Sequence, residues 1–446
     1  MGTMLFTDQD LKKLIGPLVI EQILSVTIGM ADTIMVASCG EASVSGISLV
    51  DSISVLLVGL FGAMASGGAV VAAQYMGKKD KEMVGRASNQ LFLAVGGVAL
   101  VFMVIALAGN QFLLNLIYGG IEADVMEAAR IYFYITAVSY PFLGIYNGGA
   151  ALFRAVGNAK VSMQVAVVAN LINVAGNALL IYGFQMGAAG AAISTLAARV
   201  VCAVVIFALL KKNKEIPLGK SWKPDGRILK KILYIGVPNG LENSIFQIGK
   251  LMVSSLIAGF GTASITANAI VGNVGNFQLI PGNAIGMAMI TVIGQCVGAG
   301  DVKQAEYYNR KLIKTAYLYM IVLGIGLIVL ARPVCSLYQL SPATTKLTVE
   351  ILLYHCICCM LVHPLAFAQA NSLRAAGDVK FTMVVSIASM WTCRIVLAYL
   401  IGGYMGLGVL GVWIAMTIDW CVRAFFFTTR IRSGKWTAHM NVITNG

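Results

Sequence analysis

The sequence predicts an all-α integral membrane protein, with about twelve transmembrane helices in two pseudo-symmetric lobes of six helices each. Three observations support this fold class: the composition, long apolar runs and an internal repeat. Of the 446 residues, 58% are hydrophobic and only 11% are charged, and the mean hydropathy is +0.82. A soluble protein of this length carries roughly twice that share of charged residues.

The apolar residues come in long uncharged runs, such as residues 91–109 and 317–331. As helices, such runs can span a hydrocarbon core that is about 30 Å thick. Strict alternation of apolar and polar residues, the mark of a transmembrane barrel, is absent. The first run is too long for a signal sequence and is expected to stay as an uncleaved span. The expected spans are 14–37, 44–75, 88–108, 127–150, 160–184, 188–210, 232–258, 264–296, 313–331, 347–371, 381–402 and 406–428.

Lysine and arginine predict the orientation. If the N-terminus is cytoplasmic, cytoplasmic segments hold 25 of the 32 basic residues and outer loops hold three. Cytoplasmic loops of membrane proteins carry such an excess, so both termini are predicted to be cytoplasmic in a multi-pass protein of the cell membrane. The net charge of +13 is spread over seven loops instead of one face, which argues against nucleic-acid binding. A monomer in the lipid bilayer is expected.

Four short patterns recur in the same order at an almost constant offset. Pro17-x3-Glu21 returns 221 residues later, as do Gly40-x-Ala42-Ser43 and Gln74-x2-Gly77-x2-Asp80. Arg154-Ala155-x-Gly157-x2-Lys160 returns after 220 residues. Each half holds six spans, so the copies are parallel repeats.

This repeat predicts an N-terminal lobe (residues 1–210), a basic cytoplasmic linker (211–231) and a C-terminal lobe (232–446). Two lobes around a central cleft form a transporter architecture, in which substrate binds near the membrane midplane and the lobes rock to give alternating access.

At these positions the chain resembles the multidrug and toxic compound extrusion family over nearly its whole length. The resemblance is carried by Pro17, Ala31-Asp32-Thr33, Arg154-Ala155-Val156-Gly157-Asn158, Asn173-x3-Asn177 and Leu373-Arg374-Ala375-Ala376-Gly377-Asp378. It implies secondary active antiport of amphipathic, often cationic compounds against protons or sodium ions, by two six-helix lobes that form a V.

Asp32 is the main candidate for cation coupling. It lies deep in the first span, where an ionised side chain costs about 2.5–3.5 kcal/mol or more. Asn173 and Asn177 lie one helical turn apart, and the resemblance adds Thr195 to this cluster. These oxygens suit sodium or a hydrogen-bonded proton site. Archaeal-type relatives have a second acid where this chain has Asn177. This difference weakens the case for a dehydrated sodium ion and makes a proton a fair hypothesis, and the choice between the two ions stays open. Interhelical bonding by the two asparagines is the alternative to a coupling role.

Further residues could serve the transport cycle. Pro17 permits bending of the first helix. Possible cleft or proton-relay residues are Glu21, Asp51, Tyr132, Tyr134, Glu242 and His363.

In the second lobe, Asp419 and Arg423 are spaced to form an ion pair within one helix. Glu242 could neutralise Lys250 or Arg394. The repeat mate of Asp32 is Val253, so coupling is placed in the first lobe.

Other functions have weaker support. His355 with Cys356, Cys358 and Cys359 lies within one helix and lacks a second ligand pair, so these residues are expected to be packing residues, and no cofactor other than the coupling ion is expected. Gly406-x-Gly408-x2-Gly411 follows no strand, so it is not expected to bind a dinucleotide. The sequence contains neither a P-loop nor an aspartate-rich cluster, so no motif in it indicates an enzyme. A lipid-linked saccharide flippase is the alternative function, and substrate identity does not follow from the sequence.

Overall fold

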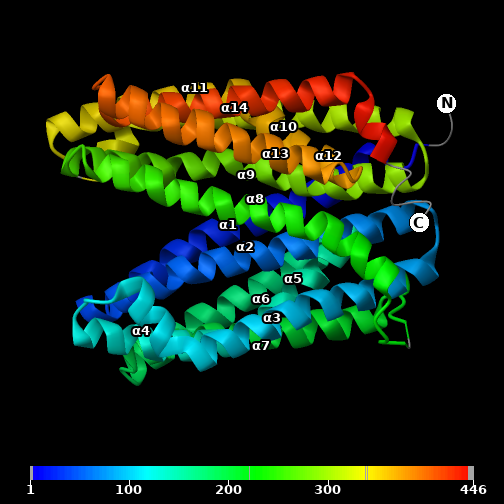
Figure 1. The fold of residues 1–446 in the computed structure, drawn as a ribbon, viewed down its shortest axis with the longest axis horizontal. Helices are drawn as coiled ribbons and strands as arrows, with labels where there is room; N and C mark the ends of the chain where they lie inside the picture. Colours follow the sequence, from blue (N-terminus) through cyan, green and yellow to red (C-terminus); the bar gives the residue numbers. More distant parts are fainter. Residues whose placement is uncertain (1–3, 220, 337, 339, 440–446) are drawn as a thin grey trace. The chain divides into compact units, whose positions relative to one another are not determined.

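The computed structural model describes residues 4–219, 221–336, 338 and 340–439, and every regular element in these ranges is a helix (Figure 1). The chain forms two compact units: Lys12–Gly240, and Met1–Leu11 with Leu241–Gly446. Both boundaries between these units lie inside long helices, α1 (Asp8–Ala37) and α8 (Gly226–Ala258). We call the two units the N-terminal and C-terminal units.

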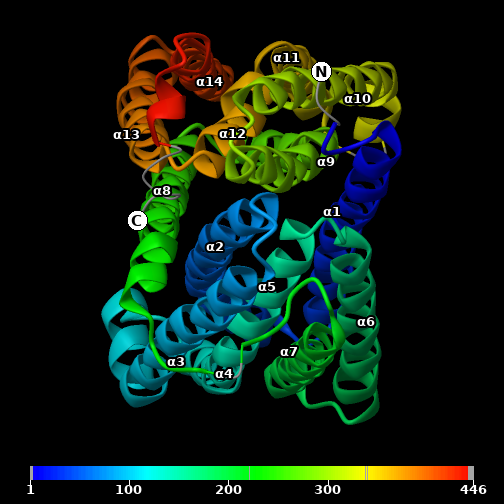
Figure 2. The same cartoon turned by 90° about the vertical axis from the view of Figure 1, so that its right-hand side faces the viewer.

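The N-terminal unit is arranged around α2. This helix contacts α3, α4, α5 and α7, and α6 packs along α7 (Figure 2). The predicted span 127–150 is broken at Ser139 into two short helices, and Pro141 lies in the first turn of the second, where its missing N–H costs nothing. The helices are α1 (Asp8–Ala37), α2 (Glu41–Gly77), α3 (Lys81–Tyr118), α4 (Ala123–Val138), α5 (Tyr140–Ala155), α6 (Ala159–Asn177), the π-helical η1 (Ala178–Gly183) and α7 (Gly187–Lys212).

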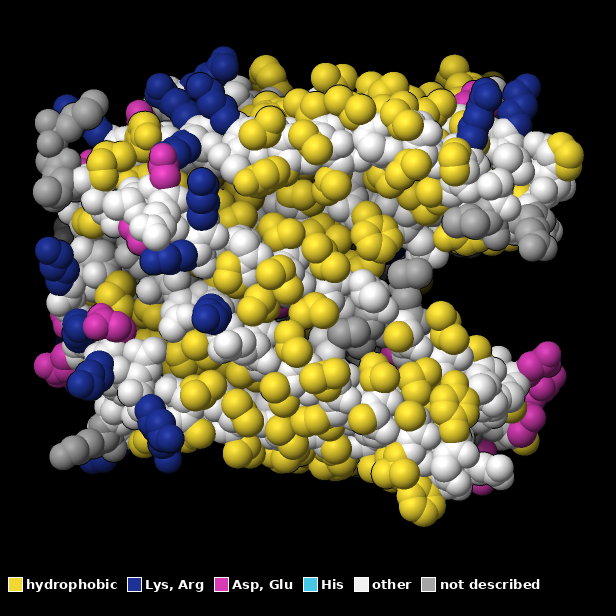
Figure 3. All heavy atoms as spheres, turned by 180° about the vertical axis from the view of Figure 1, so that it is seen from behind, with side chains coloured by type: hydrophobic (Ala, Val, Ile, Leu, Met, Phe, Trp, Pro, Cys, Tyr) yellow, Lys and Arg dark blue, Asp and Glu magenta, His cyan; other side chains and the backbone are white. Residues whose placement is uncertain are grey.

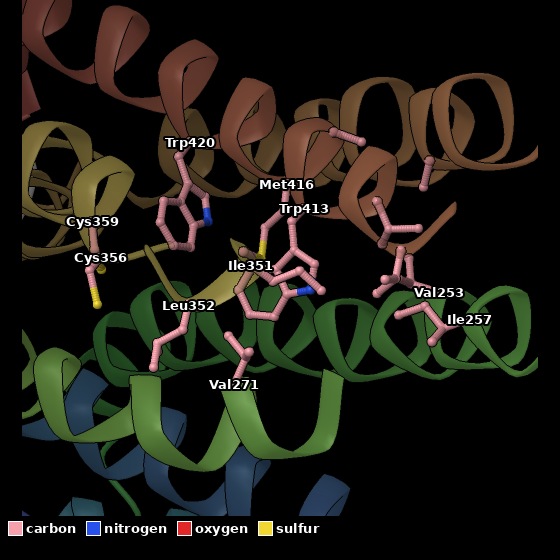
Figure 4. Packing of buried hydrophobic residues seen from close by; sticks show 14 of the residues in the cluster. Val253, Ile257, Val271, Ile351, Leu352, Cys356, Cys359, Trp413, Met416 and Trp420 are labelled. Carbon is pink, nitrogen blue, oxygen red and sulfur yellow. The ribbon is translucent and has the colours of Figure 1, made fainter. Parts of the chain in front are cut away.

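The C-terminal unit is arranged around α9, which contacts α10, α11 and α12. Its core is apolar and aromatic: Trp413, Met416 and Trp420 project from α14 toward residues of α11 and α9 (Figure 4). The helices of this half are α8 (Gly226–Ala258), α9 (Thr262–Gly298), α10 (Val302–Ser336), α11 (Pro342–His363), η2 (Pro364–Ala368), α12 (Gln369–Ala375), α13 (Val379–Ser389), η3 (Met390–Val396), η4 (Ala398–Tyr404), α14 (Gly408–Arg432) and η5 (Lys435–His439).

The prediction of an all-α membrane protein is confirmed. Ten helical segments of the described ranges are long and apolar enough to cross a membrane, five in each half. The helix pair α4 and α5 adds a sixth span to the first half, and α8 adds a sixth span to the second half. On α3, Leu100, Val101 and Val104 are about half exposed or more. Apolar side chains cover the flank of each unit between ends where charged side chains gather (Figure 3). Such large exposed apolar surfaces are unfavourable in water and favourable in lipid.

One glycine of the 406–411 pattern allows two helices to pack closely. A Cβ on Gly411 would lie 2.8 Å from the backbone of Gly402, so α14 and η4 can touch only because side chains are absent here. Gly406, in the turn before α14, and Gly408, the first residue of α14, have positive φ values of 75° and 58°. The pattern therefore joins two helices.

Candidate functional site

The site in the N-terminal unit begins with a carboxylate on α1 and an amide on α6. The Asn177 side chain is fully buried, and its Nδ2 donates to Asp32 Oδ1 at 2.5 Å. Asp32 itself is half-buried, so it can still be reached from the surface of the unit. Asn177 is the last residue of α6 before the π-helical η1, and such widened turns are frequent at functional sites.

Two more of the predicted residues lie beside this pair. Asn177 Nδ2 is 3.5 Å from Asn173 Oδ1, and Asn173 Nδ2 donates to Thr195 Oγ1 of α7 at 3.3 Å. A Cβ on Gly176 would lie 2.5 Å from Ser194 Oγ, so this glycine lets α6 and α7 approach closely. The structure thus brings Asp32 together with both asparagines and Thr195.

A second carboxylate of the same unit, Asp51 on α2, accepts a hydrogen bond from the Tyr132 hydroxyl at 3.2 Å. Tyr132 is buried on α4, whereas the Tyr134 side chain is 43% exposed. Of the two predicted tyrosines, Tyr132 therefore belongs to the polar cluster.

Arg199 on α7 is the member of the cluster that the sequence did not identify. Its charge acts on both Asp32 and Asp51, and its Nη1 donates to Ser139 Oγ at 2.6 Å. Asp32 therefore has both a second carboxylate and an arginine within electrostatic reach in this unit. Arg199 follows Thr195 by four residues on α7, and this spacing would have indicated that both lie on one helix face.

The two repeated glutamates do not join this cluster. Glu21 pairs with Arg154 at 3.1 Å and accepts from Ser162. In the C-terminal unit, Glu242 pairs with Arg374 at 2.7 Å. The expectation that Glu242 neutralises Lys250 or Arg394 is wrong, because the Glu242 carboxylate forms its ion pair with Arg374. Both pairs join the first helix of a repeat to the end of its fourth span.

The other predicted residues of the cleft are placed differently. His363 is 3% exposed, and its ring stacks on Phe367 at 4.6 Å between ring centres. No titratable partner of His363 is among the hydrogen bonds of the described residues. Pro17 lies within the continuous helix α1, so it is accommodated without ending the helix.

Asp419 and Arg423 form the predicted ion pair of α14, at 2.9 Å between Oδ1 and Nε. Arg394 of η3 lies on the other side of this carboxylate, with Nη1 3.8 Å from Oδ2. The C-terminal unit thus has its own buried charge cluster, which differs from the one around Asp32.

The comparisons with known proteins agree with this architecture. The model of the MatE family matches residues 17–179 and 238–400, so each match begins at the proline of one repeat. The chain belongs to the MatE family. It is a multi-pass membrane transporter, and the family resemblance seen in the sequence is confirmed.

Two bacterial proteins match the chain over almost the whole length of both sequences. An uncharacterized transporter, YisQ, of Bacillus subtilis is 27% identical, with 94% of this chain and 93% of the relative covered. A probable multidrug resistance protein, NorM, of Thermotoga maritima is 26% identical, with 96% and 93% covered.

A solved structure described as the outward-facing conformation of a multidrug resistance MATE transporter matches with a TM-score of 0.88. It is 20% identical and covers 96% of each chain, so it supports the two-lobed fold alone.

Proposed function

We propose that this protein exports amphipathic, often cationic compounds across the cell membrane, in exchange for protons that bind at Asp32. The hydrogen-bonded pair of Asp32 and the buried Asn177 carries the proposal. Asp32 is the acid of this pair, and it is accessible enough to exchange a proton. Multidrug efflux is favoured over saccharide flipping by the relatives that are described as probable multidrug resistance proteins. An enzymatic role is not proposed.

The chemistry of the pair explains how a proton could change the helix packing. An ionised Asp32 accepts the Asn177 amide and is offset by the charge of Arg199. Protonation removes one negative charge and turns a carboxylate oxygen into a donor. The bonds between α1 and α6 must then rearrange, and such a rearrangement is what couples ion binding to the movement of a helix.

Protons are favoured over sodium by the groups that face Asp32. Sodium requires several oxygen ligands around one point, whereas Asn177 presents its amide nitrogen to Asp32. Asn173 and Thr195 are bonded to each other instead of pointing their oxygens at a common centre. The arrangement suits one proton shared within a hydrogen-bond network.

The test is dye export from proteoliposomes that hold the full-length protein, under a proton gradient alone or a sodium gradient alone. Wild type is expected to export a cationic rhodamine under the proton gradient, and Asp32→Asn is expected to lose at least about 100-fold in rate, because the coupling proton has no site. Glu122→Gln is the matched control, since this exposed acid at the start of α4 makes no side-chain cap bond. Normal export by Asp32→Asn under both gradients would exclude the coupling role, and export that stops only when sodium is removed would exclude protons.

A further inference from the structure

A cavity of about 1110 Å³ lies at the basic end of the N-terminal unit, and the coupling site proposed above does not use it. One wall is the first part of α3, and the other is the linker between α7 and α8, which passes the end of α3 (Figure 2). The described residues that line the cavity all lie between 82 and 227, so it belongs to the N-terminal unit alone. The predicted orientation places it on the cytoplasmic side of the membrane.

The linker wall is held in place by two buried amide side chains of α3. Asn89 donates Nδ2 to two linker carbonyls, at 2.7 and 2.9 Å. Gln90 donates to the Lys223 carbonyl at 2.9 Å and accepts the N–H of Asp225, also at 2.9 Å. Both amides are 3% exposed or less. The two walls of the cavity are therefore fixed with respect to each other.

The charges that line the cavity have a positive excess. Arg86 comes from α3, Lys223 from the linker and Arg227 from the first turn of α8. All three are exposed, and none forms an ion pair with a carboxylate of the described residues. Of the two acids in the lining, Asp225 already accepts the backbone N–H of Arg227 at 3.0 Å, which leaves Glu82. The cavity therefore favours an anion.

The depth of the cavity indicates which anions can reach it. Glu82, Arg86 and Gln90 follow one another at intervals of four residues and line one face of α3. The expected span begins at residue 88, so this face runs from the aqueous side into the first turn of the span. Trp222 of the linker is 41% exposed, and its ring centre lies 6.2 Å from that of Phe207. Tryptophan is enriched at the level of the lipid headgroups, so the cavity borders that layer.

We propose that this cavity binds a phosphate group, carried by the headgroup of an anionic phospholipid or by a soluble phosphate ester. Guanidinium groups donate in pairs to phosphate oxygens, and lysine adds a further positive charge. Basic pockets beside membrane helices bind the headgroups of anionic lipids by the same chemistry. A phosphate in this cavity bridges its two walls, because Arg86 lies on one of them and Lys223 and Arg227 lie on the other.

The test measures binding to the full-length protein in detergent, from the rise in melting temperature as a probe is titrated. The lipid probe is phosphatidylglycerol, with uncharged phosphatidylcholine as its reference, and the soluble probe is glycerol 3-phosphate. The double variant Arg86→Gln with Arg227→Gln is expected to weaken binding at least about tenfold, because each basic residue contributes about fivefold near an anionic headgroup. Lys212→Gln, at an exposed basic position of α7 outside the lining, is expected to keep the wild-type affinity.

Two variants that keep every basic residue separate the cavity from simple surface charge. A Cβ at Gly85 would clash with the Pro217 carbonyl oxygen, so Gly85→Ala pushes the linker wall away from α3. This variant is expected to weaken binding about threefold or more, because the phosphate can then contact only one wall. Glu82→Gln removes the carboxylate that repels the anion and is expected to strengthen binding about threefold.

The two probes also identify the source of the phosphate. A response to phosphatidylglycerol that the double variant loses assigns the site to a lipid headgroup, and a lost response to glycerol 3-phosphate assigns it to a soluble ester. If Gly85→Ala does not accumulate, the arginine variants decide, since they change exposed side chains only. The proposal is overturned if neither probe binds to wild type, if the double variant binds both probes as wild type does, if Lys212→Gln weakens binding equally, or if Glu82→Gln weakens it.

Discussion

Asp419 is the carboxylate that offsets the charges of Arg394 and Arg423 in the C-terminal unit. Asp419→Asn leaves both neighbouring arginines without a carboxylate, and removing one partner of a buried ion pair typically destabilises a protein by about 3–5 kcal/mol. We therefore expect the melting temperature in detergent to fall clearly below that of wild type. Glu350→Gln, at an exposed position of α11, is the control. The double variant with Arg394→Gln should recover part of the loss, and equal melting temperatures for Asp419→Asn and Glu350→Gln would contradict this account.

Residue spacing alone predicted an ion pair correctly where the two partners are close in sequence, whereas the grouping of Asp32 with Asn177 and Thr195 came from the family resemblance. Asp419 and Arg423 are four residues apart in one helix, so their pairing follows from the helical repeat. Glu21 and Arg154 are separated by 133 residues, and no local pattern connects them. The signal that could have identified them is the internal repeat itself, because both members of the pair recur as Glu242 and Arg374.

At the scale of elements, the segment between the two halves of the chain is docked and is not a free hinge. Asn89 of α3 donates to the carbonyls of Gly219 and Ser221, at 2.7 and 2.9 Å. Gln90 donates to the Lys223 carbonyl at 2.9 Å. The sequence predicted this basic segment as a linker from its composition, but composition cannot show which helix receives the carbonyl groups of a loop.

Gly85 makes this docking possible and provides a test of it. A Cβ at this position would lie 1.8 Å from the Pro217 carbonyl oxygen, so Gly85→Ala must push the linker away from α3. We expect trypsin to cleave the linker, for example after Lys214, several times faster in this variant. Gly97→Ala is the matched control, since Gly97 is on the same helix and has open space around it. Equal cleavage in both variants would show that the linker is not held by α3.

At the scale of the whole molecule, the internal repeat accounts for the arrangement of the helices but not for the positions of the buried charged residues. The π-helical segments η1 and η4 lie 220 residues apart, so even these irregular turns are repeated. The polar clusters are not: Asp32 corresponds to Val253, which is buried among apolar residues. The duplicated sequence therefore predicted twelve spans in two halves, whereas the charges that distinguish the halves had to be found in three dimensions.

The topology that follows from the basic residues places the short turn between α1 and α2 outside the cell. This turn contains Cys39, which is partly exposed, whereas the other cysteines lie within helices. A membrane-impermeant maleimide is expected to label intact cells that express the protein, and Cys39→Ser is expected to abolish most of that labelling.

The pH dependence of this labelling adds a second criterion. Burial raises the pKa of the Cys39 thiol above its usual value of 9.0, and only the thiolate reacts. A raised pKa means that the reactive form is scarce at pH 7, so labelling should be slow there and should accelerate up to and beyond pH 9. Labelling that appears only after the cells are permeabilised would reverse the predicted orientation and would place both termini outside. Proton entry at Asp32 would then have to be reconsidered, because the direction of export is defined relative to this orientation.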